Sequence, residues 1–203
     1  MTQLFLDTEF SGLHRHAYLL SLALVPASGP WFYAVFADAD TASLSDWHQD
    51  NVVPYLRLTD AQLGTLGEGT YLDTDTPTIV VALRDFLATF EAVEMWADVP
   101  AYDWVLFCEL FGGALNLPRN VHYIVRDLAT LFTAKGLDVD TDRFGFAYGE
   151  GGAAGAVRSG DGRAILSPDP FPEGRGVAGL VRHCALGDAM ASKLCWLKLH
   201  DNG

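Results

Sequence analysis

Three short apolar segments within the first 36 residues place the strongest constraint on the fold. Gln3–Leu6, Ala17–Val25 and Trp31–Phe36 each have the length of a strand, and Pro-Ala-Ser-Gly-Pro separates the second from the third. A Gly-Pro pair between two apolar runs is typical of a tight turn, so we expect the last two segments to form a hairpin. The chain therefore begins with part of a sheet.

The remaining patterns are mostly helical. The apolar spacing predicts one further strand, Val93–Ala97, and helices within Ser43–Leu56 (ending near Pro54), Thr78–Phe90, Asp103–Leu115, Tyr123–Lys135 and Cys184–Leu199. Gly64, Gly67 and Gly69 mark a loop. This order predicts an α/β fold in which helices flank a mixed sheet, in a single domain spanning residues 1–203. Residues 136–182 hold 11 of the 20 glycines, and we expect them to form a surface excursion.

Composition narrows the class of protein. Half of the residues are hydrophobic, which is enough for a core and argues against global disorder. No apolar run approaches the roughly 18–20 residues of a membrane span, and Met1–Phe10 has no basic residue, so we expect neither a membrane protein nor a signal peptide. The three cysteines (Cys108, Cys184 and Cys195) form no CxxC pair, and a reducing, cytoplasmic setting is the expectation.

The charge is unevenly distributed. The formal net charge is −13, and residues 1–118 contain 16 acidic groups but only Arg15, Arg57 and Arg84, whereas the remainder holds ten groups of each sign. A protein of this kind is not held on nucleic acid by bulk charge. If it handles a polyanion, the positive charge comes from the C-terminal half, from Arg15 or from bound metal ions. The alternative is that the acidic half is a soluble surface.

Asp7 and Glu9 follow the first apolar segment. Residues i and i+2 of a strand share a face, so two carboxylates would emerge together, and they repel each other unless a proton or a cation lies between them. Oxygen ligands of this kind suit Mg²⁺ or Mn²⁺. Asp-x-Asp/Glu occurs five times, however, and Asp38 with Asp40 also follows an apolar run. The second pair is better explained by Asp40-Thr41 capping a helix near Ser43.

Two further positions could carry chemistry. Asp103 lies at the start of a predicted helix, where a helix cap is the ordinary explanation. His183 precedes Asp188 by five residues, which can bring both side chains to one helix end. His122 and Asp127 repeat that spacing. Cys184 raises the alternative of a Cys–His nucleophile, although the side chains of adjacent residues usually diverge.

The order of these motifs resembles a known family. Phe-Leu-Asp-Thr-Glu-Phe-Ser-Gly-Leu at 5–13, Tyr102-Asp103 and His183-x4-Asp188 resemble the three motifs of the DEDDh 3′–5′ exonuclease superfamily. Trp96-Ala97, Ala101-Tyr102-Asp103 and His183-x-Ala185-Leu186-x-Asp188-Ala189 are similar to its branch of small bacterial RNase AS-type exoribonucleases. The resemblance runs from residue 4 to about 199, apart from the glycine-rich stretch. In that family the His and the last Asp open the final helix, which favours 183/188 over 122/127.

The resemblance implies an RNase H-like fold and a metal-dependent 3′–5′ exoribonuclease. Such an enzyme would shorten single-stranded RNA and release nucleoside 5′-monophosphates, and the resemblance also implies a homodimer. By carry-over, two Mg²⁺ or Mn²⁺ ions are held by Asp7, Glu9, Asp103 and Asp188, and His183 is the general base. The residues expected to bind substrate are Phe10, Ser11, Leu13, Trp104 and Arg15. The residues themselves leave core packing open for Leu13 and Trp104, and a free surface loop open for Arg15.

Two other functions stay open on the sequence. A 3′–5′ DNA exonuclease or proofreading subunit would use the same motifs, because discrimination of a 2′-hydroxyl can rest on one backbone group. A catalytically silent RNase H-like binding or scaffold protein belongs to another class, and the presence of all five catalytic residue types argues against it.

Overall fold

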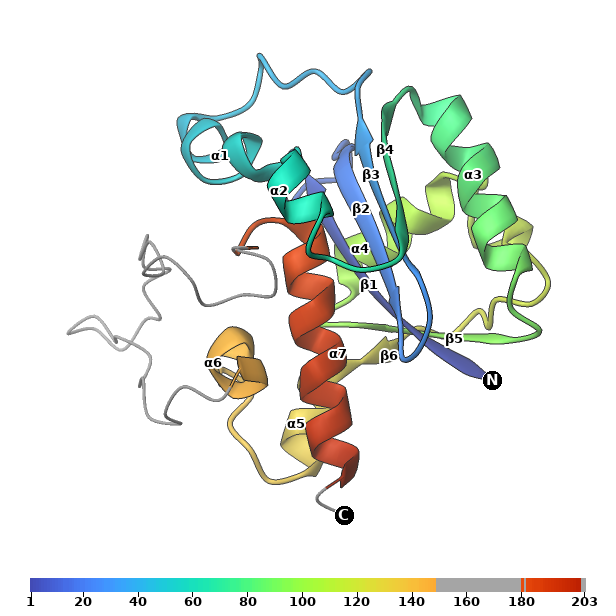
Figure 1. Ribbon diagram of the computed structural model, residues 1–203, viewed down its shortest axis with the longest axis vertical. Coiled ribbons are helices and arrows are strands. Elements are labelled where there is room, and N and C mark those ends of the chain that lie inside the picture. The colour runs from blue at the N-terminus through green and yellow to red at the C-terminus, as the bar shows by residue number, and fades with distance from the viewer. Residues whose placement is uncertain (149–179, 181, 202–203) are drawn as a thin grey trace.

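A mixed six-stranded sheet forms the centre of the molecule (Figure 1). The computed structural model describes residues 1–148, 180 and 182–201. The strands are β1 (Thr2–Phe10), β2 (Leu19–Pro26), β3 (Trp31–Phe36), β4 (Gly69–Thr74), β5 (Val93–Ala97) and β6 (Arg126–Asp127), in the spatial order β4-β3-β2-β1-β5-β6. β2 is antiparallel to β1 and β3, whereas the pairs β1–β5, β3–β4 and β5–β6 are parallel. The predicted hairpin is therefore confirmed.

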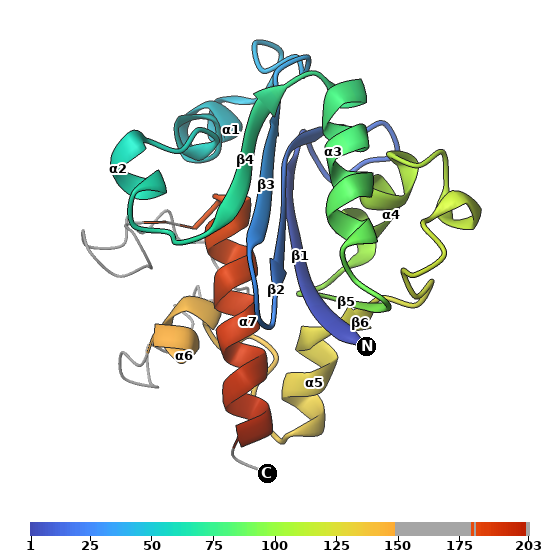
Figure 2. The ribbon, with the colours of Figure 1, turned by 45° about the vertical axis from the view of Figure 1, so that its right-hand side comes forward.

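Helices cover both faces of the sheet, which confirms the predicted α/β class and is consistent with an RNase H-like fold (Figure 2). α3 (Thr76–Ala88) and α4 (Ala101–Glu109) lie on one face. The other face carries α7 (Ala185–Asp201), and beside it lie α1 (Asp46–Asn51) and α2 (Asp60–Leu63). α5 (Leu128–Ala134) and α6 (Arg143–Tyr148) pack against α7. Short 3₁₀ turns occupy Val53–Tyr55 and Ala114–Asn116.

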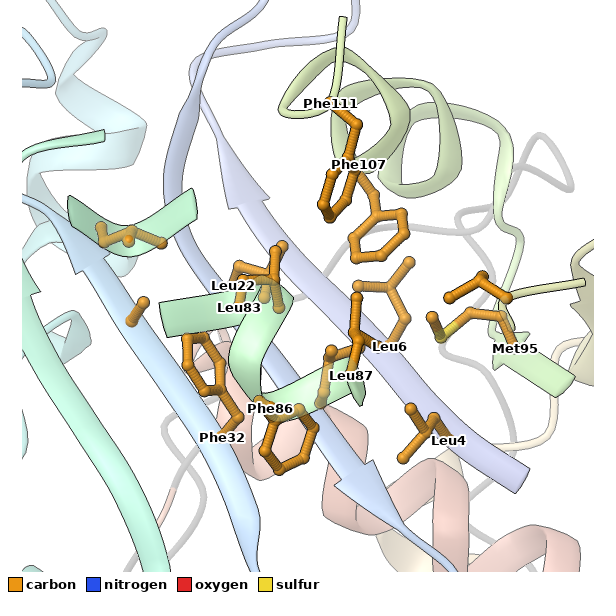
Figure 3. Close-up of a cluster of buried hydrophobic side chains, with 14 of the residues drawn as sticks. Leu4, Leu6, Leu22, Phe32, Leu83, Phe86, Leu87, Met95, Phe107 and Phe111 are labelled. Carbon is orange, nitrogen blue, oxygen red and sulfur yellow. The ribbon is translucent and has the colours of Figure 1, made fainter. Parts of the chain in front are cut away.

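The α3/α4 face encloses the first hydrophobic core (Figure 3). Leu4 and Leu6 of β1 belong to it; Leu6 lies beside Leu87 of α3 and near Phe107 of α4, and Leu83 of α3 lies beside Leu22 of β2. All of these side chains are fully buried. Because neighbouring residues of a strand point to opposite faces, the even-numbered positions of β1 face α3 and α4.

The α7 face encloses the second core. Phe5 of β1 packs there with Tyr33 of β3 and with Ala185, Leu186 and Ala189 from the first turns of α7. The odd-numbered positions of β1 therefore face α7. A third cluster joins α5, α6 and the C-terminal half of α7 through Phe132, Phe144 and Cys195, and so holds that helix along the sheet.

The structure differs from the sequence prediction in two places. Gly64 and Gly67 lie in a loop, as predicted, but this loop joins two elements that were not predicted: α2 before it and the edge strand β4 after it, which begins at Gly69. The first position of β4 requires glycine, because a Cβ at residue 69 would overlap the indole of Trp31 on the neighbouring strand. The predicted helix Tyr123–Lys135 is wrong in its first half: β6 occupies 126–127, and α5 begins only at Leu128, capped by Asp127. Within the expected excursion 136–182, residues 143–148 form α6, and residues 149–179 and 181 lie outside the described residues.

Candidate active site

Strand β1 presents two carboxylates to α7. Asp7 and Glu9 are odd-numbered, so they share the face of Phe5 and project toward the start of α7, where Asp188 lies in the first turn. All three residues are half-buried, and one carboxylate oxygen from each lies within 4.8 Å of the other two. The structure thus brings together three of the predicted metal ligands from opposite ends of the chain.

His183 is joined to this cluster through its main chain. Its N–H donates to a carboxylate oxygen of Asp188 at 2.9 Å, and the Asp188 N–H donates to the Cys184 carbonyl. His183 itself adopts φ +60°, in the left-handed region that few non-glycine residues occupy. The backbone therefore turns sharply just before α7, and the turn is closed by the same carboxylate that faces Asp7 and Glu9.

Asp103 reaches the site from the opposite helical layer. It lies in the first turn of α4 and is 8% exposed, and its Oδ1 accepts from the Thr8 hydroxyl at 2.7 Å and the Thr8 N–H at 3.0 Å. Thr8 is even-numbered and therefore points to the α4 side of β1. One oxygen of Asp103 is thus fixed by the residue that separates Asp7 from Glu9.

The carboxylates are held in an environment that disfavours charge. Burial, followed by the charge of Asp188 and Asp103, raises the pKa of both Asp7 and Glu9 well above the usual range. Burial raises the pKa of Asp188 to about 7, although the hydrogen bond from the His183 N–H acts in the opposite direction. Like charges in a desolvated site keep a proton or attract a cation.

The donor set fits a divalent metal ion. Carboxylate oxygens are the ligands that Mg²⁺ and Mn²⁺ prefer, and three of them converge here. Among the described residues, no salt bridge involves Asp7 or Glu9, and the Arg182 charge lowers the pKa of Asp188 without offsetting the effect of burial. A cation would supply the missing positive charge, and Asp103 adds a fourth carboxylate beside the group.

Asp98 is a neighbouring carboxylate that the sequence analysis did not identify. It follows β5, and its charge contributes to raising the pKa of Asp7, Asp103 and Asp188. Arg143 of α6 forms an ion pair with it at 3.0 Å. Burial raises the pKa of Asp98, and the Arg143 charge opposes that effect. The only sequence signal was the position of Asp98 at the carboxyl end of a strand parallel to β1.

The competing motifs lie elsewhere or have structural roles. Asp38 accepts from the N–H and hydroxyl of Thr76 at the start of α3. Asp40 accepts from the N–H groups of residues 42 and 43, but α1 is capped by Ser45, so the predicted helix cap at Asp40 is wrong.

The second His–Asp pair and the cysteine are likewise accounted for by structure. Asp127 caps α5 and accepts from the Val99 N–H, and His122 accepts from the Ile124 N–H. Cys184 is buried, and burial raises its pKa to about 11, so its thiol stays protonated near neutral pH.

Of the residues predicted to contact substrate, Phe10 ends β1, Ser11, Leu13 and Arg15 follow it, and Trp104 lies on α4. Phe10 stacks on Tyr102 with ring centroids 5.6 Å apart, and the Ser11 hydroxyl accepts from the Tyr18 N–H. Leu13 is 75% exposed, and Arg15 is exposed and donates to His16. Trp104 is half-buried and stacks on Phe107, so one face of its ring is used by the core. Their roles toward substrate stay predictions.

The fold and the site define a class: a mixed α/β protein whose sheet and last helix hold a desolvated carboxylate cluster suited to divalent cations. Two curated proteins, from two strains of Mycobacterium tuberculosis and each named a 3′–5′ exoribonuclease, are 31% identical to the chain over 134 residues. That alignment covers 65% of this chain and 74% of each relative. The chain belongs to the family of these 3′–5′ exoribonucleases. No family model matches it. Among the described residues, no helix has the length and apolarity needed to cross a membrane.

Proposed function

We propose that the protein is a metal-dependent 3′–5′ exoribonuclease that shortens single-stranded RNA and releases nucleoside 5′-monophosphates. The observation that carries this proposal is the convergence of Asp7, Glu9 and Asp188 within 4.8 Å, with His183 bonded to the last of them. The names of the mycobacterial relatives support RNA as the substrate class. The order of the motifs, which resembles the DEDDh superfamily, supports the 3′–5′ direction.

The proposed site holds two Mg²⁺ or Mn²⁺ ions on Asp7, Glu9, Asp103 and Asp188. When bound, such ions supply Lewis-acid stabilisation of phosphoryl oxygens and lower the pKa of a water nucleophile. The carboxylates themselves bind and orient the cations. Thr8 fixes one oxygen of Asp103, which leaves the second oxygen as the free ligand atom.

His183 is the proposed general base. Burial, with a smaller contribution from the Arg182 charge, lowers the pKa of its imidazole from the usual value. The ring is therefore neutral near physiological pH, and a ring nitrogen can accept the proton of the attacking water. The hydrogen bond from the His183 N–H to Asp188 fixes the main chain from which the ring extends.

The 3′ end of the RNA is proposed to lie against residues 10–15. Phe10 is the last residue of the strand that carries Asp7 and Glu9, and Leu13 exposes an apolar side chain that can contact the last base. Aromatic and apolar contacts with bases tolerate many sequences. Arg15 is proposed to contact a phosphate. The family resemblance also makes a homodimer our proposal for the assembly, testable by light scattering in solution.

The test is turnover of a 5′-labelled single-stranded RNA in Mn²⁺ or Mg²⁺ and in EDTA. We expect stepwise shortening from a free 3′-hydroxyl in metal, with 5′-monophosphate products, and none in EDTA. Asp7→Asn should abolish turnover, whereas Asp38→Asn, which changes the competing Asp-x-Asp pair, should not. Full activity of Asp7→Asn, or cleavage of a circular RNA, would contradict the proposal.

The same experiment separates the alternatives. Faster shortening of single-stranded DNA than of RNA would favour a DNA exonuclease. Binding without turnover in every metal would favour a scaffold. His183→Ala should lower kcat by roughly 10²–10⁴-fold with little change in Mn²⁺ affinity, the range typical of removing a positioned base. His122→Ala is the control, because His122 precedes Asp127 by the same five residues; its kcat should be close to that of the wild type.

A further inference from the structure

A tryptophan distant in sequence touches the proposed base. Trp47 of α1 meets the imidazole of His183 in a T-shaped contact, with ring centroids 5.1 Å apart and an interplanar angle of 80°. The two residues lie 136 positions apart in the sequence, and they meet at the turn that precedes α7. Edge-to-face contacts of this geometry favour one relative orientation of the two rings.

Packing of the core does not account for this contact. Helix α1 contains no buried residue, and Trp47 is 44% exposed. Among the described residues, Trp47 belongs to none of the three hydrophobic clusters. A single exposed apolar side chain is common on a protein surface; what distinguishes Trp47 is its ring contact with His183.

The helix that carries Trp47 is nevertheless held in place. Ser45 caps it by accepting from the His48 N–H and contacts the His48 ring at 2.7 Å, and the Asn51 side chain donates to the Trp47 carbonyl. α1 therefore presents the indole at a defined position instead of leaving it on a free loop.

His183, in contrast, is held within the described part of the chain by a hydrogen bond at its main chain. Its N–H is bonded to Asp188, and the hydrogen bonds recorded within residues 1–148 and 182–201 leave its ring nitrogens unbonded. An unbonded nitrogen is what a base needs, but such a ring has no polar partner to hold its rotamer. Among the described residues, the aromatic partner of the His183 ring is Trp47, and this edge-to-face contact restrains the ring.

We propose that Trp47 is a positioning residue that holds the His183 imidazole in the orientation needed to accept a proton. The inference rests on the proposed function, because it takes His183 as the base. Trp47 acts through His183 and makes no contact with the reacting atoms. Loss of an aromatic pair contact should lower kcat between about 2-fold and about 13-fold, equivalent to ~0.5–1.5 kcal/mol, with KM for RNA nearly unchanged.

The experiment compares Trp47→Leu, which keeps apolar bulk, with Trp47→Phe, which keeps a ring. Full-length proteins are assayed on single-stranded RNA at saturating Mn²⁺. We expect Trp47→Leu to lose kcat and Trp47→Phe to recover most of it. Tyr55→Leu is the matched control, because Tyr55 is 42% exposed in the next turn of the same surface segment and should show normal kcat.

Two readouts separate positioning from other roles. The first is measured in the metal-free protein without RNA. There, Trp47→Leu should shift the NMR signals of the His183 ring protons, because the indole ring current acts on them. Unchanged signals would show that the two rings are not in contact and would overturn the inference. Combined with His183→Ala, Trp47→Leu should add no further loss of kcat. A raised KM with normal kcat would identify Trp47 as a base-stacking platform and overturn the positioning role.

Failure of this inference differs from failure of the proposed function. If His183→Ala is inactive and Trp47→Leu has normal kcat, the function stands and the inference is wrong. If His183→Ala is fully active, the assignment of the base is wrong and the inference falls with it.

Discussion

Asp188→Asn should stabilise the metal-free protein while abolishing turnover. The Asp188 carboxylate is half-buried against Asp7 and Glu9, and burial raises its pKa to about 7 from a usual value of 3.8. The substitution removes the charge, and the remaining side-chain oxygen can still accept from the His183 N–H. A stabilised but inactive variant is the behaviour expected where function requires a strained site.

The sign and size of the effect follow from linkage. A carboxyl whose pKa is raised on folding stabilises the protein below its unfolded pKa, and that stability is lost as the pH rises through the folded value. The loss therefore runs from about pH 4 to about pH 7. One pKa unit is ~1.36 kcal/mol, so the full window sets a ceiling of about 4 kcal/mol. This loss of stability belongs to the three carboxylates together, because Asp7 and Glu9 titrate with Asp188.

The assay is urea unfolding in EDTA, followed by the fluorescence of the five tryptophans. Between about pH 5.5 and about pH 8, above the sequence pI of 4.6, the advantage of the variant over wild type should grow by about 2 kcal/mol. Added Mn²⁺ should stabilise wild type and leave the variant nearly unchanged. Asp38→Asn is the control: it should lower stability, because Asp38 bonds Thr76.

Two outcomes would refute this reasoning. If Asp188→Asn is less stable than wild type at about pH 8 in EDTA, the carboxylate stabilises the metal-free fold and like-charge repulsion does not dominate. If the difference between the two proteins is independent of pH, the raised pKa of Asp188 is not the cause of any difference observed.

Three substitutions outside the metal ligands test the supporting structure. Thr8→Val removes the hydroxyl bonded to Asp103 and should cost ~1–3 kcal/mol in urea unfolding, together with weaker Mn²⁺ binding in a calorimetric titration. Arg143→Met leaves Asp98 unpaired in a partly buried place and should lower the free energy of unfolding by about 3 kcal/mol. Gly69→Ala should lower the melting temperature, because the added Cβ overlaps the indole beneath it.

The parts of the fold that could be predicted from sequence are those that local patterning determines. The hairpin of β2 and β3 follows from two apolar runs around a Gly-Pro turn, and the shared face of Asp7 and Glu9 follows from strand alternation. The hairpin is decided within residues 19–36 and the shared face within residues 7–9, and neither needs a distant partner.

The missed elements depend on distant partners. β4 is a partly exposed edge strand that exists because it pairs in parallel with β3, about 40 residues earlier, and its glycine is needed for the approach to Trp31. β6 is two residues long and is defined by its pairing with β5. The glycine at the start of β4 and the short length of β6 both argue against a strand when the local sequence is considered alone. Pairing with a distant strand outweighs these local preferences.

The site shows the same division. The residue types and their order could be predicted, because carboxylates on an apolar strand are conspicuous. The ion pair of Asp98 with Arg143 and the contact of Trp47 with His183 could not, since each joins segments more than 40 residues apart. No periodicity in the sequence records such a contact.

Strand β1 explains why one short motif can organise a site from the helical layers on both faces of the sheet. Its odd positions carry Asp7 and Glu9 toward Asp188 on α7, while the even position between them, Thr8, bonds Asp103 on α4. A shift of β1 by one residue against β2 and β5 would exchange these faces: the carboxylates would enter the α3/α4 core, and Leu6 would enter the site. The buried leucines on one face and the carboxylates on the other therefore specify the same register. Core packing on the α3/α4 side holds the charges on the α7 side in place, even though those charges oppose folding when no cation is bound.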